Sequence, residues 1–422
     1  MPTTICLFED DAASQLLPLA YFRPVYNLKC GIFTLKEKIL DTFPNADITL
    51  HCRGYLAEYV KFRNPRIRVN EVPSGETLFL NGRVIVDKSL SKQLLESLDD
   101  HLFMLGNEVV AARVSARSIG RFLGKMDDPI SANMFDGFPR STVNALMVSY
   151  PWDLVKHNGD ELVKDFGRLM KRVKGKRIRG VVSKGVHLLG RKDIYIGEGA
   201  RVNPGVVLDA EEGPIYIGKQ ARIFPQATII GPVSVGEKSW IKVGAQIYGH
   251  TSIGPLSKVG GEVEGTIIHG YSNKQHGGFL GHAYVGAWVN LGADTNNSDL
   301  KNNYGTVRVT MGDKQIDTGM QFVGLTMGDH SKSAINSMFN TGTVVGVSSN
   351  IFGYGFPPKY VPSFSWGAAG ETFTTFSVDK AIEVAKRVMA RRGITFGGEE
   401  DRLFRKIFEL TGDERRRRGM PM

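Results

Sequence analysis

The sequence predicts an α/β domain followed by a left-handed parallel β-helix with helices at its carboxyl end. Short apolar runs alternate with stretches of helical spacing through residues 1–153, the pattern of an open α/β sheet. From residue 194 onward a small or aliphatic residue recurs at nearly every sixth position, and glycine often follows in the turn. The chain has 49 glycines among 422 residues, and this repeat explains them.

The first domain, residues 1–153, is expected to contain a Rossmann-like sheet. Residues 4–8 (TICLF) predict a buried first strand, and acidic residues follow at its carboxyl end. Residues 34–40 have helical spacing, and residues 77–81 (TLFLN) predict a further strand. Ligands of such sheets bind at the carboxyl ends of the strands, so polar residues there are candidate binding groups.

Three further segments complete the chain. Residues 154–180 have helical spacing with a basic last turn and predict a linker helix. Residues 181–376 form the predicted β-helix, in which three hexads make one triangular coil and the apolar residue of each hexad points inward. The positions that begin successive hexads include Ile194, Ala200, Val206, Ile215, Ala221 and Ala227. Residues 377–422 predict helices and a basic tail that cap the exposed strand edges of the last coil.

Composition limits the partners and the compartment. The formal charge is +10, but much of the excess lies in basic runs that are typical of solvated helices and tails. No stretch interleaves aromatic and basic residues as a single-strand binder does, which makes nucleic acid only a third hypothesis. Cys6, Cys30 and Cys52 show no CxxC spacing, and no segment resembles a signal peptide or a membrane span. We therefore expect a reduced, cytoplasmic protein.

A series of residues between positions 17 and 38 resembles the start of the sugar nucleotidyltransferases. The series is Leu17-Pro18-Leu19, Arg23-Pro24, Leu28, Gly31, Thr34-Leu35 and Glu37-Lys38. It is similar to the branch fused to a hexapeptide-repeat acyltransferase, as in the bifunctional enzymes that make UDP-N-acetylglucosamine. The resemblance implies that Asp10, Arg23 and Asn81 bind a nucleotide sugar or sugar phosphate. The resemblance also implies that nucleotidyl transfer would use Mg²⁺, with Asp10 or Asp11 supplying a carboxylate ligand.

The same region departs from that family at three points, the first of which is Arg23 in place of a lysine. The glycine-rich loop that cradles phosphates is replaced by residues 8–14 (FEDDAAS), which contain no glycine. Arg83 stands where the family has a metal-binding aspartate. Whether this half transfers nucleotides or serves as a scaffold is left open by the sequence.

Residues 273–301 (NKQHGGFLGHAYVGAWVNLGADTNNSDLK) carry the second resemblance. The segment is similar to the acetyltransferase half of the same bifunctional enzymes, with the pattern G-H-L-T-Y-L-G and then N-hydrophobic-G-A-G-T. In that match His276 takes the place of the catalytic base, Asn290 that of an asparagine beside the substrate, and Glu262 that of an acceptor-binding glutamate. An imidazole can remove the proton that an amine must lose to attack a thioester. The alternative is that His276 is a surface loop residue.

The acceptor pocket is expected to differ from that of the family. Phe279 stands at a tyrosine position and lacks the hydroxyl, so the hydrogen bond that this hydroxyl would make to the acceptor has to come from Tyr284 or His282. Glu264 replaces a lysine that holds the sugar phosphate. The basic residues that could compensate for this change are Lys258, Lys274 and Lys301.

The resemblance implies an acetyl-CoA-dependent N-acetyltransferase acting on an amino sugar phosphate of the glucosamine 1-phosphate type, in UDP-N-acetylglucosamine synthesis. Ser331, Lys332 and Ser333 would contact the phosphates of the cofactor, and a homotrimer is implied. Two alternatives stand beside it. One is a non-catalytic scaffold that binds nucleotide sugars. The other is a zinc enzyme of the γ-carbonic anhydrase type, with ligands drawn from His250, His269, His276 and His282.

Overall fold

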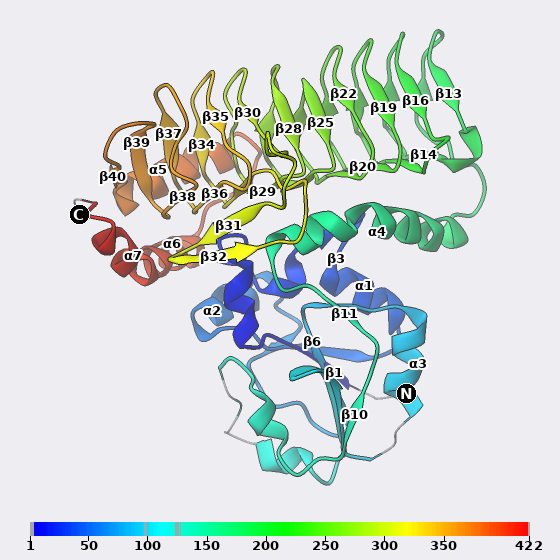
Figure 1. Ribbon diagram of the computed structural model, residues 1–422. Helices are drawn as coiled ribbons and strands as arrows, with labels where there is room; N and C mark the ends of the chain where they lie inside the picture. The colour runs from blue at the N-terminus through cyan, green and yellow to red at the C-terminus, as the bar shows by residue number, and fades with distance from the viewer. Residues whose placement is uncertain (1–3, 97–98, 123–125, 127, 421–422) are drawn as a thin grey trace. The chain divides into compact units, whose positions relative to one another are not determined.

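The computed structural model describes residues 4–96, 99–122, 126 and 128–420 (Figure 1). The last two residues of the predicted tail lie outside these ranges. The chain divides into two compact units. Unit 1 comprises Met1–Leu28, Phe33–Tyr150 and Gly398–Leu403, and unit 2 comprises Lys29–Ile32, Pro151–Gly397 and Phe404–Met422.

Unit 1 is built on a seven-stranded mixed sheet in the order β10-β8-β9-β6-β1-β4-β5. The strands are β1 (Thr4–Phe8), β4 (Asp47–Leu50), β5 (Arg68–Val69), β6 (Thr77–Asn81), β8 (His101–Leu105), β9 (Glu108–Val114) and β10 (Arg140–Thr142). The helices are α1 (Leu35–Thr42), α2 (Gly54–Arg63) and α3 (Lys88–Glu96). Three short strands, β3 (Phe33–Thr34), β7 (Val84–Ile85) and β11 (Leu146–Met147), lie outside this sheet.

The first strand is central because every residue of it is apolar or small and buried. β1 pairs in parallel with β4 on one side and with β6 on the other, a position that favours a continuous apolar run. Phe8 lies opposite Asn81 in this register. The carboxyl ends of β1 and β6 therefore bring the residues that follow them together.

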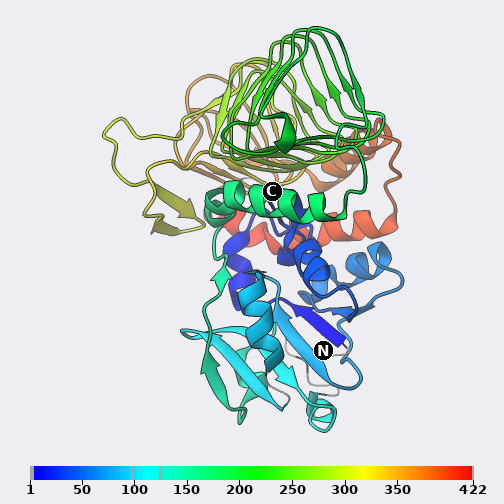
Figure 2. The ribbon, with the colours of Figure 1, turned by 90° about the vertical axis from the view of Figure 1, so that its right-hand side faces the viewer.

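Unit 2 is a left-handed parallel β-helix, whose successive coils overlie one another in Figure 2. We call its three faces sheets D, E and F. Sheet D contains β14 (Ile194–Ile196), β17 (Ile215–Ile217), β20 (Val233–Val235), β23 (Thr251–Ile253), β26 (Ile267–Gly270), β29 (Tyr284–Ala287), β33 (Thr326–Met327), β36 (Val344–Val345) and β38 (Tyr360–Val361).

The other two faces follow the same coils. Sheet E contains β12 (Val181–Val182), β15 (Arg201–Val202), β18 (Arg222–Ile223), β21 (Trp240–Ile241), β24 (Lys258–Val259) and β27 (Asn273–Lys274), and later β34 (Lys332–Ser333), β37 (Asn350–Phe352), β39 (Ser365–Ala368) and β40 (Thr374–Thr375). Sheet F contains β13 (His187–Leu189), β16 (Val207–Asp209), β19 (Thr228–Ile230), β22 (Gln246–Ile247), β25 (Glu262–Glu264) and β28 (Phe279–Gly281), and later coils add β30 (Asn296–Asn297) and β35 (Met338–Phe339).

The interior of the coils is mainly apolar, and buried serines are prominent among its polar side chains. Ile194, Ile215 and Val233 pair in register on successive coils and are buried, as the hexad pattern predicts. At one corner, the Ser239 hydroxyl accepts a hydrogen bond from the Ser257 N–H at 3.0 Å, and the Ser257 hydroxyl accepts one from the next coil. The buried hydroxyls therefore satisfy backbone groups and fix the register of neighbouring coils.

One segment, residues 298–322, leaves the coil and returns to it. It contains the antiparallel hairpin of β31 (Arg308–Met311) and β32 (Lys314–Asp317). The coil then resumes, because the Gly324 N–H donates to the His282 carbonyl at 2.9 Å and β33 pairs with β29. We call residues 298–322 the inserted segment.

Helix α4 (Pro151–Arg172) contacts β20, β23 and β29 of sheet D. Its Asn158 amide donates to the His250 carbonyl at 2.7 Å and accepts from the Ser252 hydroxyl at 2.9 Å. The short strand β2 (Lys29–Cys30) also contacts sheet D at β26. The remaining helices are α5 (Val378–Ala390), α6 (Gly398–Leu410) and α7 (Gly412–Arg417). Among the described residues, none of these helices is long and apolar enough to span a membrane.

Candidate functional site

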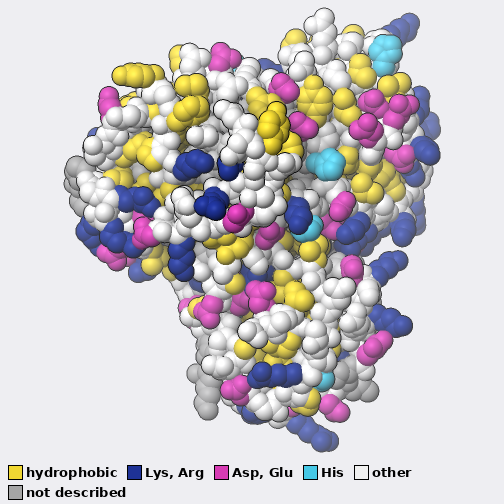
Figure 3. Space-filling model, in the orientation of Figure 1, with side chains coloured by type: hydrophobic (Ala, Val, Ile, Leu, Met, Phe, Trp, Pro, Cys, Tyr) yellow, Lys and Arg dark blue, Asp and Glu magenta, His cyan; other side chains and the backbone are white. Residues whose placement is uncertain are grey.

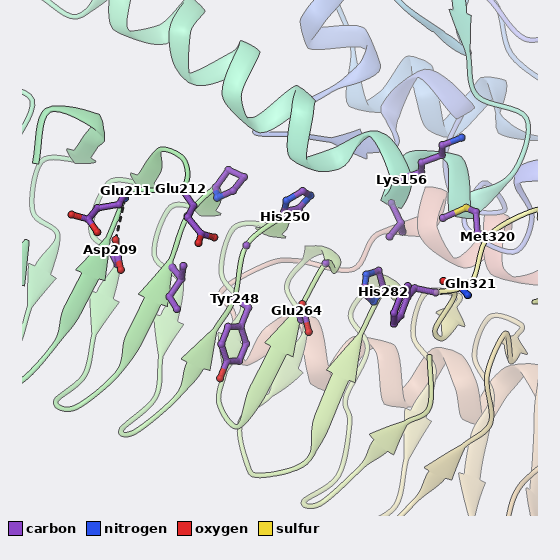
Figure 4. A pocket seen from close by; sticks show the side chains of 17 residues that line it. Lys156, Asp209, Glu211, Glu212, Tyr248, His250, Glu264, His282, Met320 and Gln321 are labelled. Carbon is purple, nitrogen blue, oxygen red and sulfur yellow. Dashed lines mark hydrogen bonds between the residues drawn. The ribbon is translucent and has the colours of Figure 1, made fainter. Parts of the chain in front are cut away.

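A pocket of about 750 Å³ lies along one edge of the β-helix, where sheet F turns into sheet D (Figure 4). His250, Gly265 and His282 hold this corner on three successive coils. The walls come from Val155 and Lys156 of α4 and from residues 320–322 of the inserted segment. We call this space the His282 pocket.

The corners have left-handed backbone conformation. φ is 59° at His250, 53° at Gly265 and 45° at His282. Side chains other than glycine resist this region at a cost of about 1–2 kcal/mol each. Two histidines occupy it here on the same edge of the prism, which places both rings at the surface of the pocket instead of in the core.

A histidine and an aspartate form a hydrogen-bonded pair in this pocket. His282 Nδ1 lies 2.8 Å from Asp299 Oδ2, and the two side chains are 27% and 13% exposed. The ring of Phe322 stacks on the imidazole at 5.1 Å between centroids. Because a carboxylate accepts hydrogen bonds, the Nδ1–H donates to Asp299 and Nε2 carries the lone pair. The arrangement is that of an oriented general base.

Two glycines make room for this pair. A side chain at Gly281 would meet the Asp299 carboxylate, and one at Gly265 would lie 3.1 Å from His282 Nε2. Glycine at position 265 therefore leaves room for the imidazole, since a Cβ there would also lie 3.0 Å from Cδ2 and 3.4 Å from Cγ of the ring. The sequence interpretation gave His282 as a hydrogen-bonding group for the acceptor or as a zinc ligand, and not as the base. The signal that it missed is the separation of 17 positions between His282 and Asp299, which is close to one coil of the repeat.

The pocket is strongly acidic. Asp209 and Glu264 end strands of sheet F, and Glu211 and Glu212 follow β16. The Glu211 N–H donates to Asp209 Oδ1 at 3.0 Å. Lys156 is the one lysine or arginine among the described residues that line the space. Acidic side chains and histidines also gather on this face of the β-helix in Figure 3. The field inside the pocket favours a cationic ligand group over an anionic one.

The structure separates the three residues predicted to be catalytic. His276 lies in an exposed turn and lines neither of the two pockets described here. Glu262 is half-buried on β25, directly opposite Phe279 of β28. Asn290 faces outward from sheet E, in a row with Asn273 and Lys332.

The predicted substrate-binding residues make internal contacts. Lys274 is buried, and its ammonium donates to the carbonyls of Gly260, His276 and Gly277 at 3.0, 3.1 and 3.2 Å. Burial lowers its pKa to about 8. The Tyr284 hydroxyl is buried. It accepts a hydrogen bond from the Lys29 N–H at 2.8 Å and donates one to the Lys29 carbonyl at 3.2 Å.

Lys301 donates to the Thr306 carbonyl at 3.0 Å within the inserted segment. It is therefore tied to that segment's own backbone.

The residues expected to hold the cofactor point in two directions. The Ser331 hydroxyl donates to the Gly346 carbonyl at 2.6 Å, and the Ser333 hydroxyl lies 2.8 Å from that of Thr295. Both serines are buried inside the coil, where they serve the backbone and the core. Lys332, between them, faces outward, and burial under its neighbours lowers its pKa to about 8.

The four histidines of the zinc alternative do not meet. His250 and His282 line the same pocket, whereas His269 contacts Tyr284 and His276 lies in its exposed turn. Within the described part of the chain, no three His, Cys, Asp or Glu side chains are grouped so that they could hold a metal ion.

In unit 1, Asp10 and Asn81 meet at the carboxyl ends of β1 and β6. Asn81 Nδ2 donates to Asp10 Oδ2 at 2.9 Å. Arg83 completes the cluster, because its Nε donates to Asp10 Oδ1 at 2.9 Å and its Nη2 to Asp10 Oδ2 at 2.6 Å. Arg23 is not part of the cluster and donates to the Leu19 carbonyl at 3.0 Å.

This cluster does not fit the Mg²⁺ that the resemblance allows. Arg83 is fully buried, and its Nη2 lies 2.6 Å from both Asp10 Oδ2 and Glu108 Oε1. A hard divalent ion needs those carboxylate oxygens as ligands, and a fixed guanidinium occupies them.

The loop that follows β1 is also closed. Asp11–Leu16 forms a 3-10 helix in the position of the phosphate loop. The buried Glu9 carboxylate accepts from the Val25 N–H at 2.8 Å and from the Arg53 guanidinium at 3.0 Å. Glu9 and Asp10, the first two acidic residues after β1, therefore serve the fold of unit 1.

Comparison with protein families gives a match for the first part of the chain. Residues 5–174 match the family of sugar nucleotidyl transferases. No curated protein matches the chain.

Solved structures give distant likenesses. One is the UDP-N-acetylglucosamine acyltransferase of Francisella novicida, at 16% identity and a TM-score of 0.31, covering 57% of this chain and 85% of that one. The UDP-N-acetylglucosamine acyltransferase of Campylobacter jejuni has 14% identity and a TM-score of 0.23, and the match covers 56% of this chain and 82% of that one. A putative glucose-1-phosphate thymidylyltransferase of Bacillus anthracis has 8% identity and a TM-score of 0.27, and the match covers 38% of this chain and 95% of that one.

Proposed function

We propose that unit 2 is an acyltransferase that moves an acetyl group from coenzyme A to the amino group of a sugar, with His282 as the general base. The observation that carries the proposal is the 2.8 Å hydrogen bond between His282 Nδ1 and Asp299 Oδ2 at the surface of a pocket of about 750 Å³. A space of this size is in the range of small-molecule sites. The oriented imidazole supplies the proton acceptor that attack by an amine requires.

The transfer balances with this one base. The acceptor nitrogen attacks the thioester carbonyl carbon while Nε2 of His282 takes its proton. The carbon–sulfur bond then breaks, and the thiolate of coenzyme A leaves and receives the proton from the imidazolium. Asp299 keeps the ring in the correct tautomer and stabilises the imidazolium between these two steps.

The charge of the pocket bears on the acceptor. Four carboxylates face one lysine in the lining, so the pocket attracts an amino group and repels a phosphate. The predicted acceptor, glucosamine 1-phosphate, carries both groups. We therefore favour an amino sugar without a phosphate near the reacting nitrogen.

Unit 1 is proposed to bind a nucleotide sugar without metal-dependent transfer. Its match to the sugar nucleotidyl transferases supports the ligand class. The ion pairs of Arg83 with Asp10 and Glu108 argue against a working Mg²⁺ centre. Synthesis of UDP-N-acetylglucosamine by the two units together and assembly as a homotrimer stay predictions.

The test measures thiol release from acetyl-CoA by the purified full chain, with glucosamine and glucosamine 1-phosphate as acceptors. H282A should lower kcat about 10²–10⁴-fold, the usual contribution of a general base. H187A is the matched control, since His187 is exposed on β13 away from the pocket, and it should keep full activity. H276A separates the two assignments of the base. Full activity in H282A together with loss in H276A would move the base to His276 and refute the proposal.

A further inference from the structure

A second pocket, of about 290 Å³, lies on the outer face of sheet E beneath the carboxyl end of α5. It is close to the other end of strand β29, because His282 stands just before that strand and Trp288 follows it directly. No part of the acyl-transfer proposal uses it. We call this space the Trp288 pocket.

The floor of the Trp288 pocket is one row of polar side chains. Lys258 pairs with Asn273, Asn273 with Asn290, and Asn290 with Lys332, each on the next coil. Neighbouring strands lie about 4.8 Å apart, so the row places two ammonium groups around a pair of amides. The amides are ordered, since Asn273 Nδ2 donates to Asn290 Oδ1 at 3.2 Å.

Two arginines at the end of α5 cover this row. Arg391 and Arg392 both line the pocket, and Arg392 Nη2 donates to Asn273 Oδ1 at 2.7 Å. Basic residues at a helix carboxyl end usually complement the helix dipole. That explanation does not extend to Lys258 and Lys332, which come from the β-helix and face the same space.

The four cations lack a partner of opposite charge. No aspartate or glutamate is found among the described residues that line the pocket, and no ion pair in the described ranges involves any of the four. Burial lowers the pKa of Lys258, and nearby Arg392, Lys242 and Arg391 lower it further. Burial and Arg391 likewise lower the pKa of Arg392. Lys258, Lys332 and Arg392 are half-buried and Arg391 is exposed, and close cations of one sign repel one another until an anion joins them.

An aromatic wall closes one side of the space. The rings of Tyr271 and Trp288 stack at 4.3 Å between centroids and 22° between planes, and both line the pocket. Apolar ring faces on one side lower the local dielectric constant, which strengthens the attraction of the cations for a ligand anion.

We propose that the Trp288 pocket is a binding site for a phosphorylated small molecule, whose phosphoryl oxygens accept from Lys258, Lys332 and Arg392. Ammonium and guanidinium donors with adjacent amide groups are the chemistry that recognises phosphate. The size of the pocket excludes a large ligand from its interior. The proposal stands whether or not unit 2 transfers acyl groups, because it rests on different residues.

The experiment measures binding of inorganic pyrophosphate to the full chain by isothermal titration calorimetry at pH 7 and low salt. Saturable binding with one site per chain is expected. K332M and R392Q should each weaken it at least tenfold, since each removes a cation that contacts the ligand. K238M is the matched control: Lys238 is a half-exposed lysine paired with Glu237 outside the pocket, and its loss changes the net charge by the same amount.

Each outcome decides the question. Absence of saturable binding, or an equal loss in K238M, would show attraction by net charge alone and overturn the proposal. Circular dichroism and melting curves of K332M and R392Q establish that the variants are folded, and R392K should restore part of the affinity. ADP and glucose 1-phosphate in place of pyrophosphate then distinguish a nucleotide from a sugar phosphate as the source of the phosphoryl group. Pyrophosphate binding in H282A separates this site from the acyl-transfer site.

Discussion

The His282 pocket and the Trp288 pocket flank one strand of four residues, β29, and differ in nearly every other respect. The first is lined by four carboxylates and one lysine, and its histidine is held by Asp299. The second is lined by four cations, without a carboxylate among the described residues that form it. Both are built from the same repeating coil.

The difference shows which positions of a β-helix can change. Inward positions such as Ile268 of β26 must stay apolar, because they fill the core of the prism. Outward and corner positions meet only solvent, a helix or a ligand. Charge of either sign can therefore gather on one edge while the core of the same coil stays unchanged.

The largest expected effect is on the acidic side of this comparison. D299N should lower kcat for acyl transfer about 10²–10⁴-fold, because an amide cannot fix the tautomer of His282 as a carboxylate does. Thiol release from acetyl-CoA measures the change. D313N, in the exposed turn of the inserted hairpin, is the control and should keep full activity. If D299N reacted at the wild-type rate, Asp299 would have no role in acyl transfer, and the His282 pocket would lose its distinction from the Trp288 pocket as a catalytic site.

An intermediate effect is expected when the acidic pocket is made more neutral. The double variant E212Q/E264Q should improve kcat/KM for glucosamine 1-phosphate relative to glucosamine about tenfold, from roughly 0.7 kcal/mol for each removed repulsion. The ratio of the two acceptors, measured with one enzyme preparation, cancels differences in folding. If the ratio does not move, the carboxylates do not select the acceptor.

The smallest effect concerns pH in the basic pocket. The pKa of Lys332 is lowered to about 8, so the free protein loses this charge as the pH rises through about 8. Pyrophosphate affinity should fall about threefold between pH 7 and 8.5, within the limit of tenfold per pH unit for one proton.

The stability contribution of Lys332 should change in the opposite direction. Its pKa is lower in the folded than in the unfolded chain, so folding becomes more favourable between about pH 8 and the ordinary lysine value. K332R keeps its charge and should flatten the affinity profile. A steep profile in K332R would assign the titration to Lys258, whose pKa is also lowered.

The sequence predicted the fold of unit 2 because the apolar position of each hexad is the one whose side chain faces inward. It predicted the α/β sheet of unit 1 from TICLF and TLFLN, which became β1 and β6. Side-chain partners were harder, since they depend on neighbours one coil away. Lys274 looked like a surface cation, yet its position in β27 points it into the coil, where three carbonyls surround it.

The candidate site shows the same limit. The pairing of His282 with Asp299 depends on a left-handed corner and on a segment that leaves the coil, and neither feature is visible in a residue pattern. Arg391 and Arg392 come from a helix more than a hundred positions from Asn273. The sequence did indicate that Arg83 was out of place for a metal site, and the structure supplies the reason in its two carboxylate partners.

The inserted segment departs from the prism and rejoins it without disturbing the pairing of β29 with β33. Its residues 320–322 form a wall of the His282 pocket, while the imidazole itself belongs to the coil. The same segment supplies Asp299, which holds the imidazole at 2.8 Å, so one excursion from the coil contributes both a wall of the pocket and the partner of its histidine. A descendant that exchanged or shortened the loop would have to keep an acid at position 299 to keep the histidine oriented, whereas residues 320–322 could change without loss of that pair.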